Sequence, residues 1–224
     1  MGLQGQAWPV LPNVGGFDLA QLAPFRAAQP TSQRKIILLK GYQHLYGRAL
    51  FALRALVLCQ QIIRERGYEV VIYSANPEVT IAAQLAAHEA NIPIRVIPHS
   101  PLEEILRLHG QARVYIGNSI SDAISISSLE AMCLGAFPVQ SNTACCDEWF
   151  EDGRTALFTE PEDPHSIAAA LQRALTDDAL VDQAAQLNLE VARQRLDPQR
   201  LQAQVIDLYQ QSAARPRRPN HPGP

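Results

Sequence analysis

Six short apolar runs alternate with longer segments of helical character, and this alternation restricts the chain to few folds. The runs are KIILLK, YEVVIYSA, IRVIP, ARVYIGN, AFPVQS and TALFTE, and they begin at residues 35, 68, 94, 112, 136 and 155. KIILLK is continuously apolar between its lysines, as expected of a strand covered by helices on both faces. Repeated strand–helix alternation predicts an α/β fold, a doubly wound, Rossmann-like three-layer sandwich with about six parallel strands.

The boundaries of the intervening helices follow from capping residues. Residues 47–67 are predicted to form one long helix that ends at Gly67. Ser100 is the expected N-cap of the helix before ARVYIGN, and Asp163 that of the helix after TALFTE. A proline follows each of these two caps, at the first helical position, where its missing N–H is not needed.

The predicted organisation has four parts. Residues 1–33 are rich in Pro, Gly and Gln and form an N-terminal segment, and residues 34–176 form the Rossmann-like domain. Residues 177–212 are expected to add C-terminal helices. The Pro-rich residues 213–224 are predicted to be a disordered tail.

Composition and charge exclude several classes of protein. The 224 residues carry a formal net charge of −3, which argues against a broad nucleic-acid interface. No apolar run approaches the roughly 18 residues needed to span a bilayer, and the first residues lack a signal-peptide pattern. The four cysteines match no zinc-ligand spacing, so a reduced, cytoplasmic chain is expected.

Ligands of such sheets bind outside the carboxyl ends of the strands, so the loops there are the candidate site. The first loop, KGYQHLYGRAL, places Lys40, Gly41 and Arg48 near a strand end and a helix start. Cations at that position suit a phosphate group, because the amides of a helix N-terminus already favour negative charge. The alternative is an ordinary solvated loop lysine and helix arginine.

The stretch GNSISDAISISSLE offers hydroxyls and free amides at another helix start. A diphosphate is expected to lie over residues 125–128, with Ser125, Ile126 and Ser127 as donor contacts. Glu130 follows one turn later, where its carboxylate would accept hydrogen bonds from two ribose hydroxyls. A solvent-facing glutamate is the alternative, but the neighbours of Glu130 are mostly apolar.

A nucleobase edge is the candidate ligand of the loop IPHSPLEE. His99 is the candidate base contact there, and an ordinary surface histidine is the more frequent alternative. The chain contains neither G-x-G-x-x-G nor a Walker pattern. Their absence argues against a dinucleotide oxidoreductase and, more strongly, against a P-loop NTPase.

Three segments together resemble one enzyme family. They are DAISISSLEAMCLGAFPV, SNTACCDEWFEDGRTALFTEPEDPHSIAAAL and PNVGGFDLAQLAPF, and the resemblance covers about residues 12–175. They are similar to motifs of the retaining glycosyltransferases of family 4, which have the GT-B fold and use nucleotide-linked sugars. The resemblance implies that the chain is the C-terminal, donor-binding domain of such an enzyme.

The resemblance also implies specific roles. Glu130 matches the glutamate that binds the nucleotide ribose, and Asp122 matches the acid close to the donor sugar. Lys40 and Arg48 are the candidates for the basic pair that neutralises the diphosphate. No metal or other cofactor is expected besides the UDP- or GDP-sugar donor. The acceptor would be a glycan or a small molecule.

Several positions depart from the family pattern. Asp122 is one methylene shorter than the family's glutamate, and Ala123 and Ser125 replace two flexible glycines. In the first loop Tyr42 stands near the position of the family's arginine, and Arg48 near that of its lysine. A subfamily with its own donor loop would explain these differences, and so would loss of activity.

The length of the chain favours an incomplete enzyme. Enzymes of this family have two Rossmann-like domains, and this sequence predicts one, so it is either an excised domain or half of a split enzyme. Alone, it is expected to bind the donor and to transfer poorly or not at all. Peripheral membrane association of the full enzyme is left open. The alternatives are a non-catalytic nucleotide-binding or scaffold module, a GT-B-fold nucleotide-sugar epimerase fragment and an unrelated flavodoxin-like domain.

Overall fold

A parallel six-stranded sheet forms the centre of the molecule. The computed structural model describes residues 11–12, 14–123, 125–143 and 145–214. The strand order is β3-β2-β1-β4-β5-β6, and every pair is parallel. The strands are β1 (Ile36–Lys40), β2 (Glu69–Tyr73), β3 (Ile94–Val96), β4 (Ala112–Gly117), β5 (Phe137–Ser141) and β6 (Leu157–Thr159). The predicted doubly wound α/β fold is confirmed.

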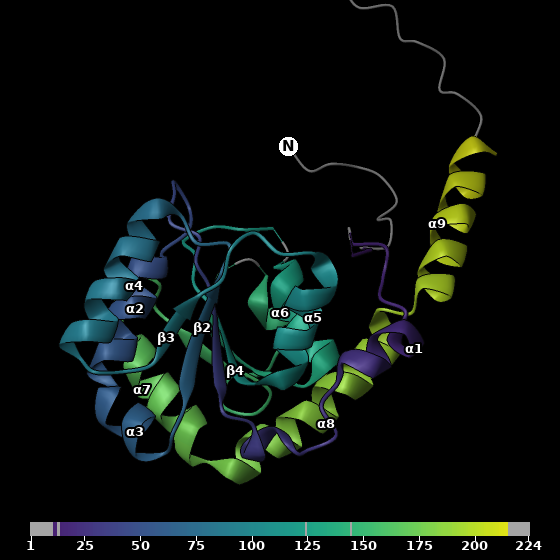
Figure 1. Ribbon diagram of the computed structural model, residues 1–224. Helices are drawn as coiled ribbons and strands as arrows, with labels where there is room; N and C mark the ends of the chain where they lie inside the picture. The colour runs from purple at the N-terminus through teal and green to yellow at the C-terminus, as the bar shows by residue number, and fades with distance from the viewer. Residues whose placement is uncertain (1–10, 13, 124, 144, 215–224) are drawn as a thin grey trace, which may run out of the picture.

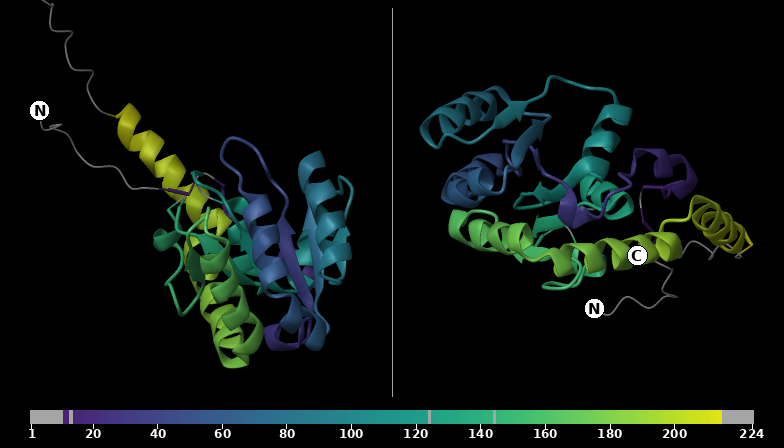
Figure 2. Two further views of the ribbon diagram at one scale, coloured as in Figure 1. Left: turned by 90° about the vertical axis from the view of Figure 1, so that its left-hand side faces the viewer. Right: turned by 60° about the horizontal axis from the view of Figure 1, so that its bottom comes forward.

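Helices cover both faces of the sheet, as Figure 1 shows. One face carries α2 (Ala49–Leu58), α3 (Gln60–Glu65), α4 (Pro77–Glu89) and α7 (Pro164–Thr176). The other face carries α5 (Leu102–Gln111) and α6 (Ile126–Leu134). The long helix α8 (Asp178–Arg195) begins against the first group and runs across to pack on α6, as the right view of Figure 2 shows.

Alternation along the strands divides the core between the two faces. Ile37 and Leu39 of β1 face α2, whereas Leu38 between them faces the side of α5 and α6. All three side chains are fully buried, as a strand with helices on both sides requires. The continuous apolar run of the sequence therefore serves two separate hydrophobic clusters.

Two predicted helix boundaries are wrong and one is confirmed. The expected helix of residues 47–67 is interrupted at Cys59, where the chain turns between α2 and α3. Ser100 does not cap α5, because its hydroxyl donates to the carbonyl of Pro98 at 3.1 Å and the helix begins only after Pro101. Asp163 caps α7 as predicted, and its carboxylate accepts from the amide of His165 at 2.9 Å.

The remaining elements lie at the ends of the chain. They are α1 (Leu19–Leu22), the 3-10 turns Ala23–Phe25, Thr31–Gln33 and Cys146–Glu148, and α9 (Pro198–Ala213). Helix α9 projects away from the body of the molecule (Figure 1), and Leu201 is its only residue buried in the described chain. None of the described helices could span a bilayer. Most of the predicted tail, residues 215–224, lies outside the described residues.

Candidate functional site

A cleft of about 420 Å³ opens at the carboxyl ends of β1 and β4. The strand order reverses between these two strands, since the chain moves outward from β1 to β3 and then returns to β4. Crevices at this reversal are where open α/β sheets bind their ligands. The cleft is lined by Lys40, Tyr42, His44, Tyr46, Gly47, Tyr115, Gly117, Asn118, Ser119, Ser121, Asp122, Ala123, Ser125 and Gln140.

Lys40 and Asp122 lie far apart in the sequence, and both line this cleft. Lys40 ends β1, and burial lowers the pKa of its ammonium, an effect that the carboxylates of Asp122 and Glu130 oppose. The Nζ atom lies 4.4 Å from the centre of the Tyr42 ring. Asp122 is exposed, and its carboxylate accepts from the neighbouring amide of Ala123 at 2.8 Å. The cleft therefore offers one cation and one acid to a ligand.

Helix α6 begins at the edge of the cleft without a side-chain cap. Ser125 is the N-cap residue, and its hydroxyl makes no capping bond. The amides of Ile126 and Ser127 have no hydrogen-bond partner in the part of the chain that the structure describes. Such amides favour an anion. Ile126 is 49 % exposed, whereas Ser127 is buried and the hydroxyl of Ser128 donates to Oε1 of Gln140 at 2.6 Å.

Glu130 of α6 is not among the described residues that line the cleft, and 10 % of its side chain is exposed. Burial raises the pKa of its carboxyl to about 7, against the opposing charge of Lys40. Its Oε2 atom lies 3.5 Å from Nε2 of His109, a residue of α5. Burial, reinforced by Lys40, lowers the pKa of His109 to about 3. The contact therefore joins a neutral imidazole to a carboxyl group that titrates near neutral pH.

His109 was not predicted to belong to the site. Its Nε2 atom also lies 3.4 Å from the hydroxyl of Tyr73, at the end of β2. The sequence contained a signal that His109 would be buried. His109 follows the apolar residues Ile105 and Leu106 by four and three positions, so the three side chains share one face of the helix. That face packs on the sheet.

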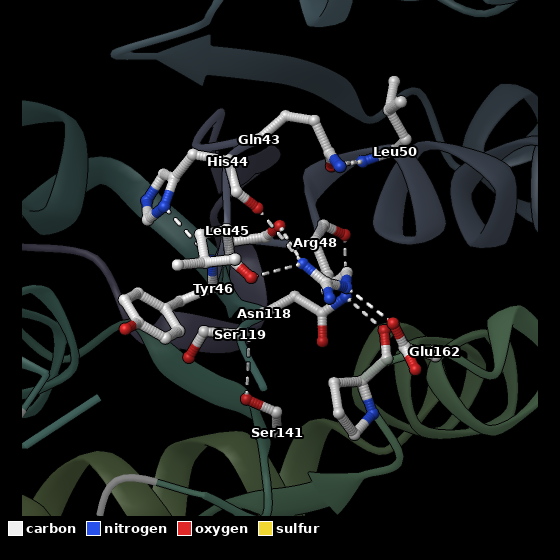
Figure 3. Close-up of polar contacts among 12 residues, drawn as sticks. Gln43, His44, Leu45, Tyr46, Arg48, Leu50, Asn118, Ser119, Ser141 and Glu162 are labelled. Carbon is white, nitrogen blue, oxygen red and sulfur yellow. Dashed lines mark hydrogen bonds and ion pairs between the residues drawn. The ribbon is translucent and has the colours of Figure 1, made fainter. Parts of the chain in front are cut away.

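Arg48 does not point into the cleft. Figure 3 shows its guanidinium turned back into its own loop, where Nη1 donates to the carbonyls of His44, Leu45 and Gly47. Its Nε atom pairs with Oε1 of Glu162 at 2.6 Å. With these contacts Arg48 holds the loop in shape, and the basic pair expected from the sequence is reduced to Lys40 in this structure.

Gly41 and His99 lie apart from the cleft. Gly41 is buried, and a Cβ there would come within 2.7 Å of Cα of Ala75, so glycine permits the close packing of two loops. His99 is exposed and lines a second cavity of about 1150 Å³ beside β2, β3 and α4. Tyr42 lines both cavities. The two spaces therefore adjoin at one tyrosine.

Acidic and thiol groups do not gather into a metal site. Within residues 11–214, leaving aside 13, 124 and 144, no three His, Cys, Asp or Glu side chains lie together as a metal would require. Lys40 lines the cleft, and Ser125, the N-cap residue of α6, lies at its edge.

Comparison with known proteins decides the family. The family described as "Glycosyl transferases group 1" matches residues 40–191. The chain belongs to this family. The match begins at Lys40, the last residue of β1, and spans β2 to β6, the residues that line the cleft and most of α8.

A curated relative in this family is a D-inositol 3-phosphate glycosyltransferase of Nocardioides sp. The two are 27 % identical over 121 residues, which is 54 % of this chain and 26 % of the relative. The chain therefore spans about a quarter of the length of that relative.

Solved structures of glycosyltransferases share the fold. Sucrose-phosphate synthase of Thermosynechococcus elongatus superposes with a TM-score of 0.73 at 20 % identity, over 89 % of this chain and 51 % of the synthase. Anabaena HepE, solved with UDP and glucose, gives 0.72 at 14 % identity, over 88 % and 55 %. The C-terminal domain of LpcC from Francisella tularensis gives 0.66 at 16 %, over 80 % and 98 %. The resemblance to GT-B glycosyltransferases is thus confirmed.

Proposed function

We propose that this chain binds a UDP- or GDP-linked sugar in the cleft and takes part in transferring the hexosyl group, with retention of configuration, to a glycan or small-molecule acceptor. The observation that carries the proposal is that Lys40 and Asp122 line one cleft together with Ser125, the N-cap residue of α6, at the point where strand order reverses. Membership of the glycosyltransferase family supports it.

Each group has a defined part in the proposed reaction. Lys40 and the amides of Ile126 and Ser127 stabilise the negative charge that develops on the departing diphosphate. Asp122 accepts hydrogen bonds from hydroxyls of the donor sugar. Glu130 accepts hydrogen bonds from the ribose through the part of its carboxyl that remains exposed. No metal or other cofactor takes part in this scheme.

The second cavity supplies a place for the nucleobase. Since it adjoins the cleft at Tyr42, a nucleotide could run from His99 to Lys40 across that residue. The acceptor would be held mainly by a further domain, and the protein would work in the cytoplasm with peripheral membrane association left open. The HepE structures with UDP and with UDP-glucose support a uridine nucleotide as the first ligand to test.

Titration calorimetry with UDP, GDP, UDP-glucose and GDP-mannose tests the proposal. Saturable binding of at least one nucleotide is expected, with loss of affinity in Asp122→Asn only for the sugar-linked form. If none of the four ligands binds, the proposal is wrong.

A non-catalytic nucleotide-binding module is the second candidate, because Asp122 bonds its own neighbour and Arg48 is engaged elsewhere. That module would bind nucleotide, and it would neither transfer nor hydrolyse the donor after fusion to an acceptor domain of this family.

A further inference from the structure

Three aromatic side chains line the cleft from a single loop. Tyr42, His44 and Tyr46 alternate along the loop between β1 and α2, so that they share one side of it. The ring centres of Tyr42 and His44 lie 5.6 Å apart, and those of His44 and Tyr46 lie 6.2 Å apart, both edge to face. We call these three side chains the aromatic platform.

The aromatic platform is exposed although its rings are large. Tyr42 is 43 % exposed and Tyr46 is 49 % exposed, while both line the cleft that holds Lys40 and Asp122. In the left view of Figure 2 the loop rises above the carboxyl edge of the sheet. Exposed aromatic rings around a polar cleft are typical of binding sites rather than of the general surface.

The loop that carries the platform is held rigidly from the opposite side. Arg48 bonds three of its carbonyls and Glu162, and in Figure 3 the rings of His44 and Tyr46 point away from that guanidinium. The amide of Asn118 donates to the carbonyl of Arg48 at 2.9 Å, and the amide of Ile120 donates to that of Tyr46 at 2.9 Å.

Glycine closes the loop at its end. A Cβ on Gly47 would come within 2.4 Å of the carbonyl oxygen of Tyr42, so only glycine lets the two ends of the loop approach this closely. Gly47 also pairs with Ser119 in an antiparallel bridge. The platform is therefore fixed before any ligand arrives, which lowers the ordering cost of binding.

We propose that the aromatic platform binds a pyranose ring. A pyranose presents a face of C–H groups and a rim of hydroxyls. The face matches aromatic rings, whose surfaces carry partial negative charge. The rim matches Ser119, Ser121 and Asp122, which line the same cleft. This inference rests on the proposed function, because it assumes that the ligands of the cleft are sugars.

Two sugars could supply that ring: the sugar of the donor and that of the acceptor. A donor sugar would stack on Tyr46 while its diphosphate meets Lys40. An acceptor sugar would enter from the exposed outer side of Tyr46 after the nucleotide has bound. The two sources share the same chemistry, and the arms of one experiment separate them.

The experiment compares wild type with Tyr46→Ala, Tyr46→Phe and Leu45→Ala. Leu45 is the matched control, because it lies on the same loop and is 73 % exposed. It is not among the described residues that line the cleft. In the donor arm, calorimetry measures the affinity for UDP and for UDP-glucose. In the acceptor arm, saturation-transfer NMR measures the affinity for methyl α-glycosides of glucose, galactose and mannose, with and without saturating UDP.

Tyr46→Ala is expected to weaken sugar-dependent binding about tenfold in one arm, whereas Tyr46→Phe and Leu45→Ala stay within about twofold of wild type. The affinity for UDP itself should not change in any variant. Weaker binding of UDP-glucose assigns the ring to the donor, and weaker binding of a glycoside assigns it to the acceptor.

The inference and the proposed function fail differently. If UDP binds and Tyr46→Ala leaves UDP-glucose and all three glycosides at wild-type affinity, the platform does not bind sugar. The same conclusion follows if the wild type shows no sugar-dependent binding in either arm. If no nucleotide binds while a glycoside still binds in a Tyr46-dependent way, the proposed function fails and the sugar platform stands.

Discussion

At the scale of single residues, the carboxyl group of Glu130 has the most unusual environment in the site. It lies 3.5 Å from the buried imidazole of His109, and burial raises its pKa to about 7 against the opposing charge of Lys40. A carboxyl group that titrates near neutral pH will change its hydrogen-bonding capacity within the working range of most enzymes.

Nucleotide affinity should therefore depend on pH through Glu130. A ribose hydroxyl donates well to a carboxylate and poorly to the protonated acid, so we expect wild-type binding of UDP to tighten about three- to tenfold from pH 6 to pH 8. Glu130→Gln should bind more weakly and lack this component. The affinity is measured by calorimetry on both proteins. The ionisation of UDP itself affects both measurements equally and therefore cancels in the comparison. Parallel pH profiles for the two proteins would contradict the assignment.

Folding stability should change with pH in the opposite sense. The folded-state pKa of Glu130, about 7, lies above its ordinary value of 4.5, so between these pH values the folded protein holds more protons than the unfolded chain. Stability is therefore lost as pH rises through this window. Glu130→Gln should avoid a loss on the order of 2 kcal/mol, measured by urea unfolding at pH 5 and pH 8.

The buried His109 acts with the reverse sign. Its pKa is lowered to about 3, so its contribution is lost as the pH falls from 6.5 toward 3. The comparison of wild type with Glu130→Gln between pH 5 and pH 8 is what isolates the glutamate.

Lys40 should matter for the diphosphate and not for the nucleoside. Lys40→Met removes a charge-assisted contact, and we expect UDP to bind about 10- to 100-fold more weakly while uridine changes less than about twofold. Lys35→Met is the matched control, because Lys35 precedes the same strand at its other end. If Lys40→Met loses as much affinity for uridine as for UDP, the lysine does not bind the phosphates. Both affinities come from calorimetry.

At the scale of elements, the loop between β1 and α2 shows how one side chain can fix a segment. Arg48 ties three carbonyls of the loop, and Gln43 accepts from the amide of Leu50 and thereby caps α2. The carbonyls of His44 and Leu45 are exposed and can bind water, whereas that of Gly47 is part-buried, and such a carbonyl is costly when it loses a charged donor. The loop and the first turn of α2 therefore form one hydrogen-bonded unit.

Arg48→Ala should destabilise the protein by about 1–3 kcal/mol, chiefly because the part-buried carbonyl of Gly47 loses its charged donor. Glu162→Gln should cost less than about 1 kcal/mol, since the carboxylate is largely exposed. Arg54→Ala, an exposed arginine of α2 itself, is the control and should stay within about 0.5 kcal/mol. Urea unfolding of the three variants gives these values. A loss in Arg48→Ala no larger than in Arg54→Ala would contradict the role given to the loop.

The sequence predicted the strands and most helices because their signals are local. Apolar runs marked all six strands, and Asp163 marked the start of α7. The same reasoning failed at Ser100, whose hydroxyl has a closer acceptor in Pro98, and at Cys59, where no glycine or proline announces the turn. A local sequence pattern does not show which of several possible hydrogen-bond partners a side chain will take, or where a helix will be interrupted.

The site was predictable only in part for a related reason. Lys40 was found because it ends a strand at the edge of the sheet where ligands bind, and Asp122 because it matches an acid of the family motif. The direction of a long side chain is set by tertiary contacts, and no local rule shows that Arg48 would reach Glu162, 114 positions along the chain. His109 was missed because its partner Glu130 lies on another helix.

At the scale of the whole molecule, stability is concentrated in the sheet and its two helical layers. Helix α9 contributes little to that core, because Val205, Ile206 and Tyr209 are exposed and only Leu201 is buried among its described residues. Elements with so few buried contacts open locally at little cost in free energy.

Removal of residues 205–224 should therefore lower the melting temperature by less than about 3 °C. Leu201→Ala in the full chain should cost more, about 2 kcal/mol, because it empties a buried position between α9 and the N-terminal segment near Gly16. Differential scanning calorimetry distinguishes the two. A truncated chain that melts lower than Leu201→Ala would show that the outer turns of α9 carry more stability than their exposure indicates.

The bonds that Arg48 makes to its loop have a thermodynamic consequence for any ligand of the cleft. These bonds restrict the backbone of residues 42–48 in the folded chain, so that less of its entropy is left to be lost on association. Binding should then be accompanied by a small negative change in heat capacity that reflects the surfaces brought together and no coupled ordering of the loop. The enthalpy of binding would vary only gently with temperature.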